Sequence, residues 1–133
     1  MYSYCQYKFQ FTHEQYLNCI QTRKFRHSLA KLRSSSHFLE IERGRYNNTP
    51  KANRICKLCF AAIESEFHFV LVCPLLLNIR EKYIPKKYIV YTNEHKFNIL
   101  MSSKSEKVLL NLAMYSYYAF KERQRILDLH QRV

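Results

Sequence analysis

The sequence predicts a mostly α-helical protein whose helices surround a small cluster of cysteine and histidine residues, with one short extended segment before it. Gly44 is the single glycine among 133 residues, which leaves few turns at positive φ and argues against a hairpin-rich sheet. Capping boxes precede two segments with apolar residues at helical spacing. With 47% hydrophobic residues, the chain can bury one core of ordinary size.

The first 34 residues are expected to form a strand stub and a basic helix. Aromatic and polar residues alternate through Tyr7, Phe9 and Phe11, which is typical of a short strand. Residues 12–15 (THEQ) then match a capping box. We therefore expect a helix over residues 13–34, with lysine and arginine on one side.

The segment that follows is expected to be extended and then to turn. Residues 37–42 (HFLEIE) alternate in polarity, which predicts a short extended segment. Gly44 and the polar residues 47–50 (NNTP) predict a loop that leads to the cysteines.

A short helix carrying His68 is expected over residues 64–72. Pro74 disfavours helical geometry at Cys73 and is well placed to begin the next helix, which is expected to reach Tyr83. The interruption matters because residues five positions apart on an unbroken α-helix point about 140° apart. His68 and Cys73 could then hardly share one ion.

The last third of the chain is expected to be a linker and two helices. The linker covers residues 85–92, and Asn93 is expected to cap a short helix that ends at Met101. Residues 103–106 (SKSE) match a second capping box, before a long helix to about residue 129. We therefore divide the chain into three segments: 1–50, 51–84 and 85–133.

Four residues form the pattern C-x2-C-x8-H-x4-C: Cys56, Cys59, His68 and Cys73. Thiolate sulfur and imidazole nitrogen are ligands that zinc accepts in tetrahedral geometry. The alternative is three buried thiols and a core histidine, which is common for any one of them alone. The full set predicts a CCHC zinc knuckle with one structural ion, because four protein ligands leave no position for water.

Positive charge predicts a polyanionic partner. Lysine and arginine number 22 against 10 acidic residues, which gives a formal net charge of +12, as is typical of nucleic-acid-binding domains. The alternative for a run of basic residues is a solvated helix face. Candidate contacts with phosphates and unpaired bases lie just before and within the knuckle: Arg43, Arg45, Tyr46, Lys51, Arg54 and Lys57.

Several classes of function are disfavoured. Asp128 is the only aspartate, whereas polymerases and nucleases that use two metal ions need clustered carboxylates. The five cysteines do not resemble a disulfide framework, so we expect a reducing compartment, nuclear or cytoplasmic. No signal peptide or membrane span is expected.

Two roles are open for His37. It either packs against the knuckle or hydrogen-bonds to a residue beside the ligands, or it is a local packing or capping residue.

Several stretches also resemble those of a known family. They are RSSSHFLEIERGRYNN, RICKLC, ESEFHFVLVCP, the R-x-x-Y of Arg80 and Tyr83, and MSSKSEKVLLNLAMYSYYAFKER. They resemble the cysteine-rich C-terminal region of non-LTR (LINE-type) retrotransposon endonuclease–reverse transcriptase polyproteins. The resemblance implies a zinc knuckle that grips template RNA or target DNA. It does not bring the polymerase, because the Tyr-x-Asp-Asp signature is missing, so the chain is expected to be a fragment or a short independent product.

We therefore expect a zinc-binding nucleic-acid-binding module without polymerase or nuclease activity of its own, with RNA favoured over DNA. The alternative is a zinc-stabilised protein–protein interaction module, in which the knuckle and the aromatic C-terminal helix bind a partner protein. A membrane or a small-molecule substrate is not expected.

Overall fold

The computed structural model describes residues 22–131, and over this range the protein is mostly helical, as predicted. The helices are α3 (Arg23–Arg33), α4 (Glu40–Tyr46), α5 (Leu77–Tyr83), α6 (Lys86–Ile89), α7 (Glu94–Met101) and α8 (Glu106–Gln131). Between them lie two 3-10 turns, η1 (Lys51–Asn53) and η3 (Pro74–Leu76), and a π-helical turn, η2 (His68–Val72). The described residues form no β-strand, only an isolated antiparallel bridge between Ile55 and Ile63.

Some predictions for the N-terminal segment lie outside the described residues. They are the strand stub at residues 1–11, the capping box at residues 12–15 and the first part of the helix expected over residues 13–34. The described part of that helix is α3, which ends at Arg33, one residue before the predicted end.

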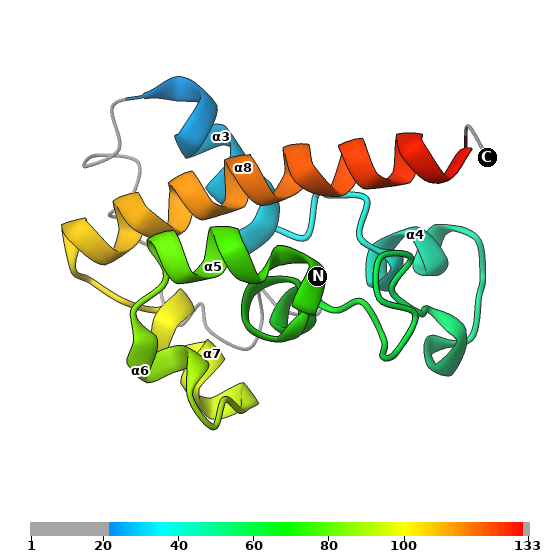
Figure 1. Cartoon of the computed structure of the whole chain (residues 1–133), viewed down its shortest axis with the longest axis horizontal. Helices are drawn as coiled ribbons and strands as arrows, with labels where there is room; N and C mark the ends of the chain where they lie inside the picture. Colours follow the sequence, from blue (N-terminus) through cyan, green and yellow to red (C-terminus); the bar gives the residue numbers. More distant parts are fainter. Residues whose placement is uncertain (1–21, 132–133) are drawn as a thin grey trace.

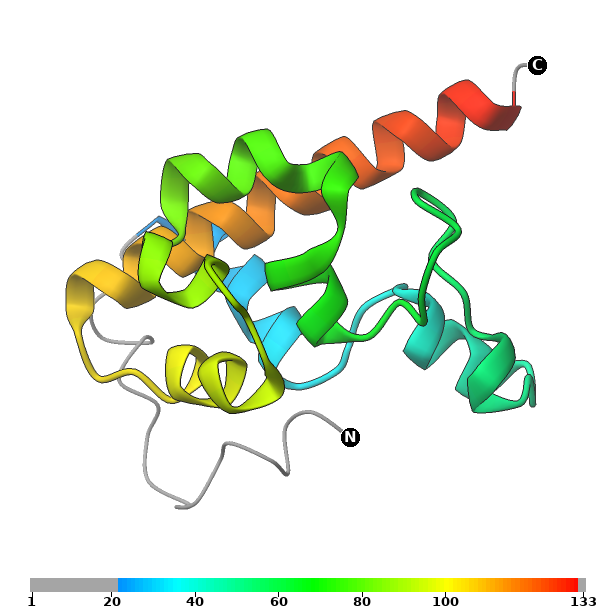
Figure 2. The same cartoon turned by 60° about the horizontal axis from the view of Figure 1, so that its bottom comes forward.

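Helix α8 is the long central element, and both α3 and α5 pack against it (Figure 1). Helices α6 and α7 pack together near its N-terminal end, and α4 lies near its C-terminal end, as Figures 1 and 2 both show. The buried face of α8 includes Leu109, Leu112, Ala113, Tyr115, Ala119 and Ile126. Residues from all three predicted segments contribute to one buried cluster.

Phe69 fastens the middle of the chain to α8. Its ring stacks on Phe120 with centroids 4.7 Å apart, and it meets Tyr115 edge-on at 5.9 Å. The Tyr115 hydroxyl donates a hydrogen bond to the Phe69 carbonyl oxygen. Burial raises the pKa of Tyr115 far above its usual value, so the hydroxyl remains a donor at neutral pH.

The caps of the last two helices agree only partly with the prediction. Asn93 caps α7 as expected, accepting a hydrogen bond from the Lys96 amide at 2.8 Å. At α8 the capping residue is Ser105, whose hydroxyl accepts from the Val108 amide at 3.4 Å. Ser103, the predicted cap, still belongs to the end of α7, because its amide donates to the Leu100 carbonyl.

The extended segment predicted over residues 37–42 is wrong, because α4 begins at Glu40 and includes Gly44. Ion pairs join Glu40 to Arg43 at 3.5 Å and Glu42 to Arg45 at 2.8 Å, which is the i,i+3 spacing of a helix. The acidic residues lie in its first turn and the basic ones in its last, which suits the helix dipole. An alternation of polarity over only six residues is weak evidence for an extended segment, and the i,i+3 ion pairs stabilise the helix instead.

The linker predicted over residues 85–92 also contains a helix, the short α6. Tyr88 is buried there, and the Val90 amide donates to the Lys86 carbonyl. Pro85 precedes the first residue of this helix, a position that proline tolerates well because it has no amide hydrogen to satisfy.

Gly44 leaves room for the side chain of Arg54. A Cβ atom at residue 44 would lie 2.4 Å from Arg54 Cγ. Arg54 cannot easily move aside, because its Nε donates to the Thr49 carbonyl and its Nη1 to the Ile41 carbonyl, both at 2.9 Å. Glycine is therefore required at this position because the Arg54 side chain packs closely against the backbone of α4.

We expect Gly44→Ala to destabilise the protein by about 1–3 kcal/mol, the usual cost of overpacking, measured by urea unfolding. In an Arg54→Ala background the same change should be neutral or stabilising, because alanine is the better helix former. An equal loss of stability in both backgrounds would contradict this explanation.

Candidate metal centre

The four predicted ligands lie together, within the segment of residues 54–75 that we call the ligand segment. The ligand atoms of Cys56, Cys59, His68 and Cys73 are all within 4.8 Å of one another. Cys56 Sγ is 3.9 Å from Cys73 Sγ, and Cys59 Sγ is 3.3 Å from His68 Nε2. Three of the four residues are buried. The cluster can therefore bind one metal ion.

These distances fit a tetrahedral ion. With metal–sulfur bonds of about 2.3 Å and metal–nitrogen bonds of about 2.0 Å, ligand atoms lie about 3.8 Å apart for two sulfurs and about 3.5 Å apart for sulfur and nitrogen. The observed separations of 3.9 Å and 3.3 Å differ from these by small amounts. Protein atoms supply all four positions, which is the arrangement of a structural site.

The first two cysteines lie in a tight turn. The Cys56 amide donates to the Ala62 carbonyl at 2.8 Å, and the Phe60 amide donates to the Cys56 carbonyl at 3.0 Å. The Leu58 amide points at Cys56 Sγ, 3.4 Å away. Phe60 adopts a positive φ of 56° to close the turn. A backbone amide thus holds the Cys56 sulfur toward the cluster, and the turn brings Cys59 beside it.

The π-helical turn η2 brings the other two ligands to the same side. The Cys73 amide donates to the His68 carbonyl at 2.8 Å, a hydrogen bond that spans five residues. Such a turn is wider than an α-helical one, so residues five apart lie nearly one above the other. The predicted helix end at Cys73 is confirmed, since its ψ of 119° is not helical. The π turn was not predicted from the sequence.

The buried sulfur atoms of Cys56 and Cys73 lie within hydrogen-bonding distance of each other. The Cys56 thiol bonds to the Cys73 sulfur and lies in a buried environment, and these causes raise the pKa of Cys56 to about 12. The same bond lowers the pKa of Cys73, because it stabilises the Cys73 thiolate. A metal ion bound between these sulfurs would displace the protons of both thiols.

A buried ion pair, which the sequence analysis missed, joins the ligand segment to α8. Arg123 donates from Nε to Glu64 Oε2 at 2.9 Å and from Nη2 to Glu64 Oε1 at 2.8 Å. Only 1% of the Glu64 side chain and 7% of the Arg123 side chain are exposed. Glu64 Oε2 also lies 3.8 Å from Cys56 Sγ. The sequence did contain a sign of this pair, because Arg123 lies four positions after Ala119 and therefore on the buried face of the helix.

Arg80, the first residue of the R-x-x-Y stretch, stabilises the backbone at Cys73. It is 2% exposed, and it donates to the Val70 carbonyl at 2.8 Å and the Cys73 carbonyl at 2.9 Å. These carbonyls come from the end of η2, where helical bonding leaves acceptors without partners. Arg80 therefore orients the backbone at Cys73.

His37 does not contact a ligand. Its Nε2 lies 3.0 Å from Glu66 Oε1 in a fully buried pair. The Leu39 amide donates to His37 Nδ1, so the hydrogen sits on Nε2 and is donated to Glu66. Ser35 donates to the same carboxylate oxygen. His37 therefore ties the loop after α3 to the start of the helix that carries His68.

The candidate nucleic-acid residues come together on α4, η1 and the turn between the cysteines, and we call this the α4 surface. Arg43 and Lys57 both pair with Glu40, at 3.5 Å and 3.6 Å, and Arg45 lies over the Tyr46 ring at 5.0 Å. Tyr46 is 73% exposed and Lys51 is also exposed. Arg54 differs from the others, because two of its nitrogens bind backbone carbonyls.

Within residues 22–131, no helix has both the length and the apolar character needed to cross a membrane.

The chain matches no protein-family model, no curated protein and no solved structure.

Proposed function

We propose that this chain is a zinc-stabilised nucleic-acid-binding module, related to the C-terminal region of non-LTR retrotransposon polyproteins, with RNA favoured over DNA. The observation that carries the proposal is the α4 surface, a group of exposed basic side chains beside a closed cluster of four metal ligands. The formal net charge of +12 supports the same partner.

Zinc is the metal that suits the ligand set best. Three thiolates and an imidazole select a borderline-soft ion, and zinc prefers tetrahedral geometry. The ion would be structural, holding the turn at Cys56 and Cys59 against η2. The thiols must be reduced to bind it, which favours a nuclear or cytoplasmic location.

The α4 surface is suited to phosphates and an unpaired base. Arg43 and Arg45 have side chains that are half exposed although each forms an ion pair, and exposed pairs are weak enough to exchange partners. Tyr46 offers an exposed ring on which a base can stack.

Neutralising this surface should weaken nucleic-acid binding. For the triple variant Arg43→Gln, Arg45→Gln and Lys51→Gln, we expect at least a tenfold loss of affinity for single-stranded RNA. The slope of log affinity against log salt should fall by about two units, since each lost phosphate contact removes about 0.7 on a single strand. Fluorescence anisotropy across a salt series measures both quantities.

The matched control replaces three exposed lysines elsewhere, Lys86, Lys104 and Lys107, with glutamine. It removes the same charge and should change affinity much less. Equal effects of the two triple variants would show that the α4 surface is not the contact. Weak and salt-insensitive binding of the native protein to every RNA and DNA would refute the proposed function itself.

The second candidate is a protein-interaction module. It is favoured by three aromatic rings that are largely exposed around the ligand segment: Phe38, Tyr46 and Phe60. The same triple variant separates the two functions. A protein partner held by these rings would remain bound while nucleic-acid affinity falls.

A further inference from the structure

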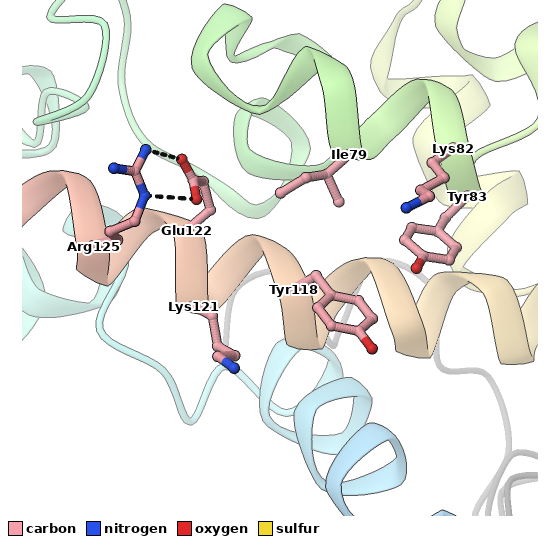
Figure 3. Close-up of a pocket in the computed structure, with 7 residues that line it drawn as sticks. All are labelled: Ile79, Lys82, Tyr83, Tyr118, Lys121, Glu122 and Arg125. Atoms are coloured by element: carbon pink, nitrogen blue, oxygen red, sulfur yellow. Dashed lines mark hydrogen bonds and ion pairs between the residues drawn. The ribbon is translucent and has the colours of Figure 1, made fainter.

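A groove of about 600 Å³ runs between α5 and α8, away from the metal cluster. Its volume lies within the range of ligand-binding clefts. The residues that line it are Ile79, Lys82 and Tyr83 from α5, and Tyr118, Lys121, Glu122 and Arg125 from α8 (Figure 3). We call it the tyrosine groove.

Two parallel rings form its aromatic surface. Tyr83 and Tyr118 stack with centroids 5.8 Å apart and planes only 8° from parallel. Tyr118 is 36% exposed, although Phe25 and Tyr117 also contact its ring, with centroids 5.9 Å and 5.1 Å away. The exposed part of this supported pair of rings offers an aromatic surface against which a base can stack.

The charges around the rings are predominantly positive. Arg125 is bound to Glu122, with Nε donating to Oε2 at 3.0 Å, and this guanidinium lowers the pKa of Glu122. Lys82 and Lys121 form no ion pair with any carboxylate in the described part of the chain. Their ammonium groups lie instead near rings, 5.9 Å from the Tyr83 centroid and 5.4 Å from the Tyr117 centroid. The groove therefore presents two uncompensated cations beside an aromatic face.

We propose that the tyrosine groove is a second contact for single-stranded nucleic acid, with an unpaired base against the tyrosine rings and neighbouring phosphates on Lys82 and Lys121. This inference rests on the proposed function for the class of its ligand. The contact is separate from the α4 surface, because the two lie on different helices (Figure 1). Residues 118 and 125 are about 10 Å apart along the α8 axis, so the groove offers a linear track.

Charge and stacking can be tested separately in the full chain, with a labelled oligouridine and its deoxy counterpart as probes. Lys82→Gln with Lys121→Gln should weaken binding about tenfold and lower the salt slope by about one unit or slightly more. The matched control is Lys104→Gln with Lys107→Gln, which removes equal charge from the exposed start of α8. It should have much smaller effects on both quantities.

The stacking contact has its own signature. Tyr118→Leu should weaken binding by about tenfold and leave the salt slope unchanged, because no phosphate contact is lost. Tyr118→Phe keeps the ring and should retain nearly native affinity. Circular dichroism checks that each variant remains folded, and the Tyr118→Phe result stands even if Tyr118→Leu unfolds.

The outcomes distinguish this inference from the proposed function. If the groove variants bind like their control while the α4-surface variant loses affinity, the groove proposal is refuted and the proposed function stands. If the native protein binds no strand in a salt-dependent way, both fall. Competition by uridine monophosphate or inorganic phosphate as strong as by the strand would overturn the strand contact and indicate a small-ligand site.

Discussion

Reduced, metal-loaded protein should contain one zinc ion per chain, and chelation of that ion should unfold the ligand segment. Structural zinc sites of this kind contribute about 10 kcal/mol or more of apparent binding free energy. The turn at Cys56 and Cys59 has few other means of holding its shape, because it is closed by short-range hydrogen bonds and an isolated bridge. Elemental analysis gives the stoichiometry, and hydrogen exchange locates the loss of structure.

The loss should be local. Amides in the middle of α8, from Leu109 to Ala119, should keep more of their protection than residues 54–75, because their side chains face α3 and α5. Cys73→Ser should prevent stoichiometric zinc binding, whereas the matched control Cys19→Ser, at a cysteine outside the predicted ligand set, should not. Fully reduced protein that contains no zinc would refute the metal site.

Arg123→Met should be among the most destabilising single substitutions in α8. It would leave the Glu64 carboxylate buried without its bidentate partner, and breaking a buried pair in this way costs about 3–5 kcal/mol. Urea unfolding of the zinc-loaded protein measures the loss. The substitution should also weaken the attachment of α8 to the ligand segment, because Arg123 joins the two through Glu64.

Arg125 provides the matched control two residues further along α8. It pairs with Glu122 on the surface, with 59% of its side chain exposed, so Arg125→Met should change stability little. Glu64→Gln should recover part of the loss in the Arg123→Met background, because it removes the buried charge and keeps an acceptor. If Arg123→Met costs no more than Arg125→Met, the buried pair does not hold the two parts together.

The features that were predicted correctly depend on nearby residues. The cluster of four candidate ligands was predicted because thiolate and imidazole chemistry restricts metal ligands to a few residue types at a recognisable spacing. The helix after Asn93 and the helix end at Cys73 were found because a cap and a proline act within one turn. The end of α3 followed from the same kind of local pattern.

The errors arose where distant contacts decide. Residues 40–46 form a helix rather than an extended segment, and its first amide is capped by Glu64, 24 residues away. One error is local instead: Ser105 rather than Ser103 caps α8, and the Ser103 amide donates to the Leu100 carbonyl. Arg54 is one of the predicted phosphate contacts, and its hydrogen bonds to Ile41 and Thr49 give it a structural role as well.

The sequence by itself determined the helical class and which four cysteine and histidine residues form the cluster that can bind a metal ion. Capping residues, prolines and ligand spacing act over a few residues, so they can be read without knowing the fold. Only the tertiary structure decided that α4 is a helix, that Arg123 neutralises Glu64, and that tyrosines from α5 and α8 stack in one groove. These features join residues 24 to 59 positions apart or bring together separate helices, and no local pattern records which distant partners will meet.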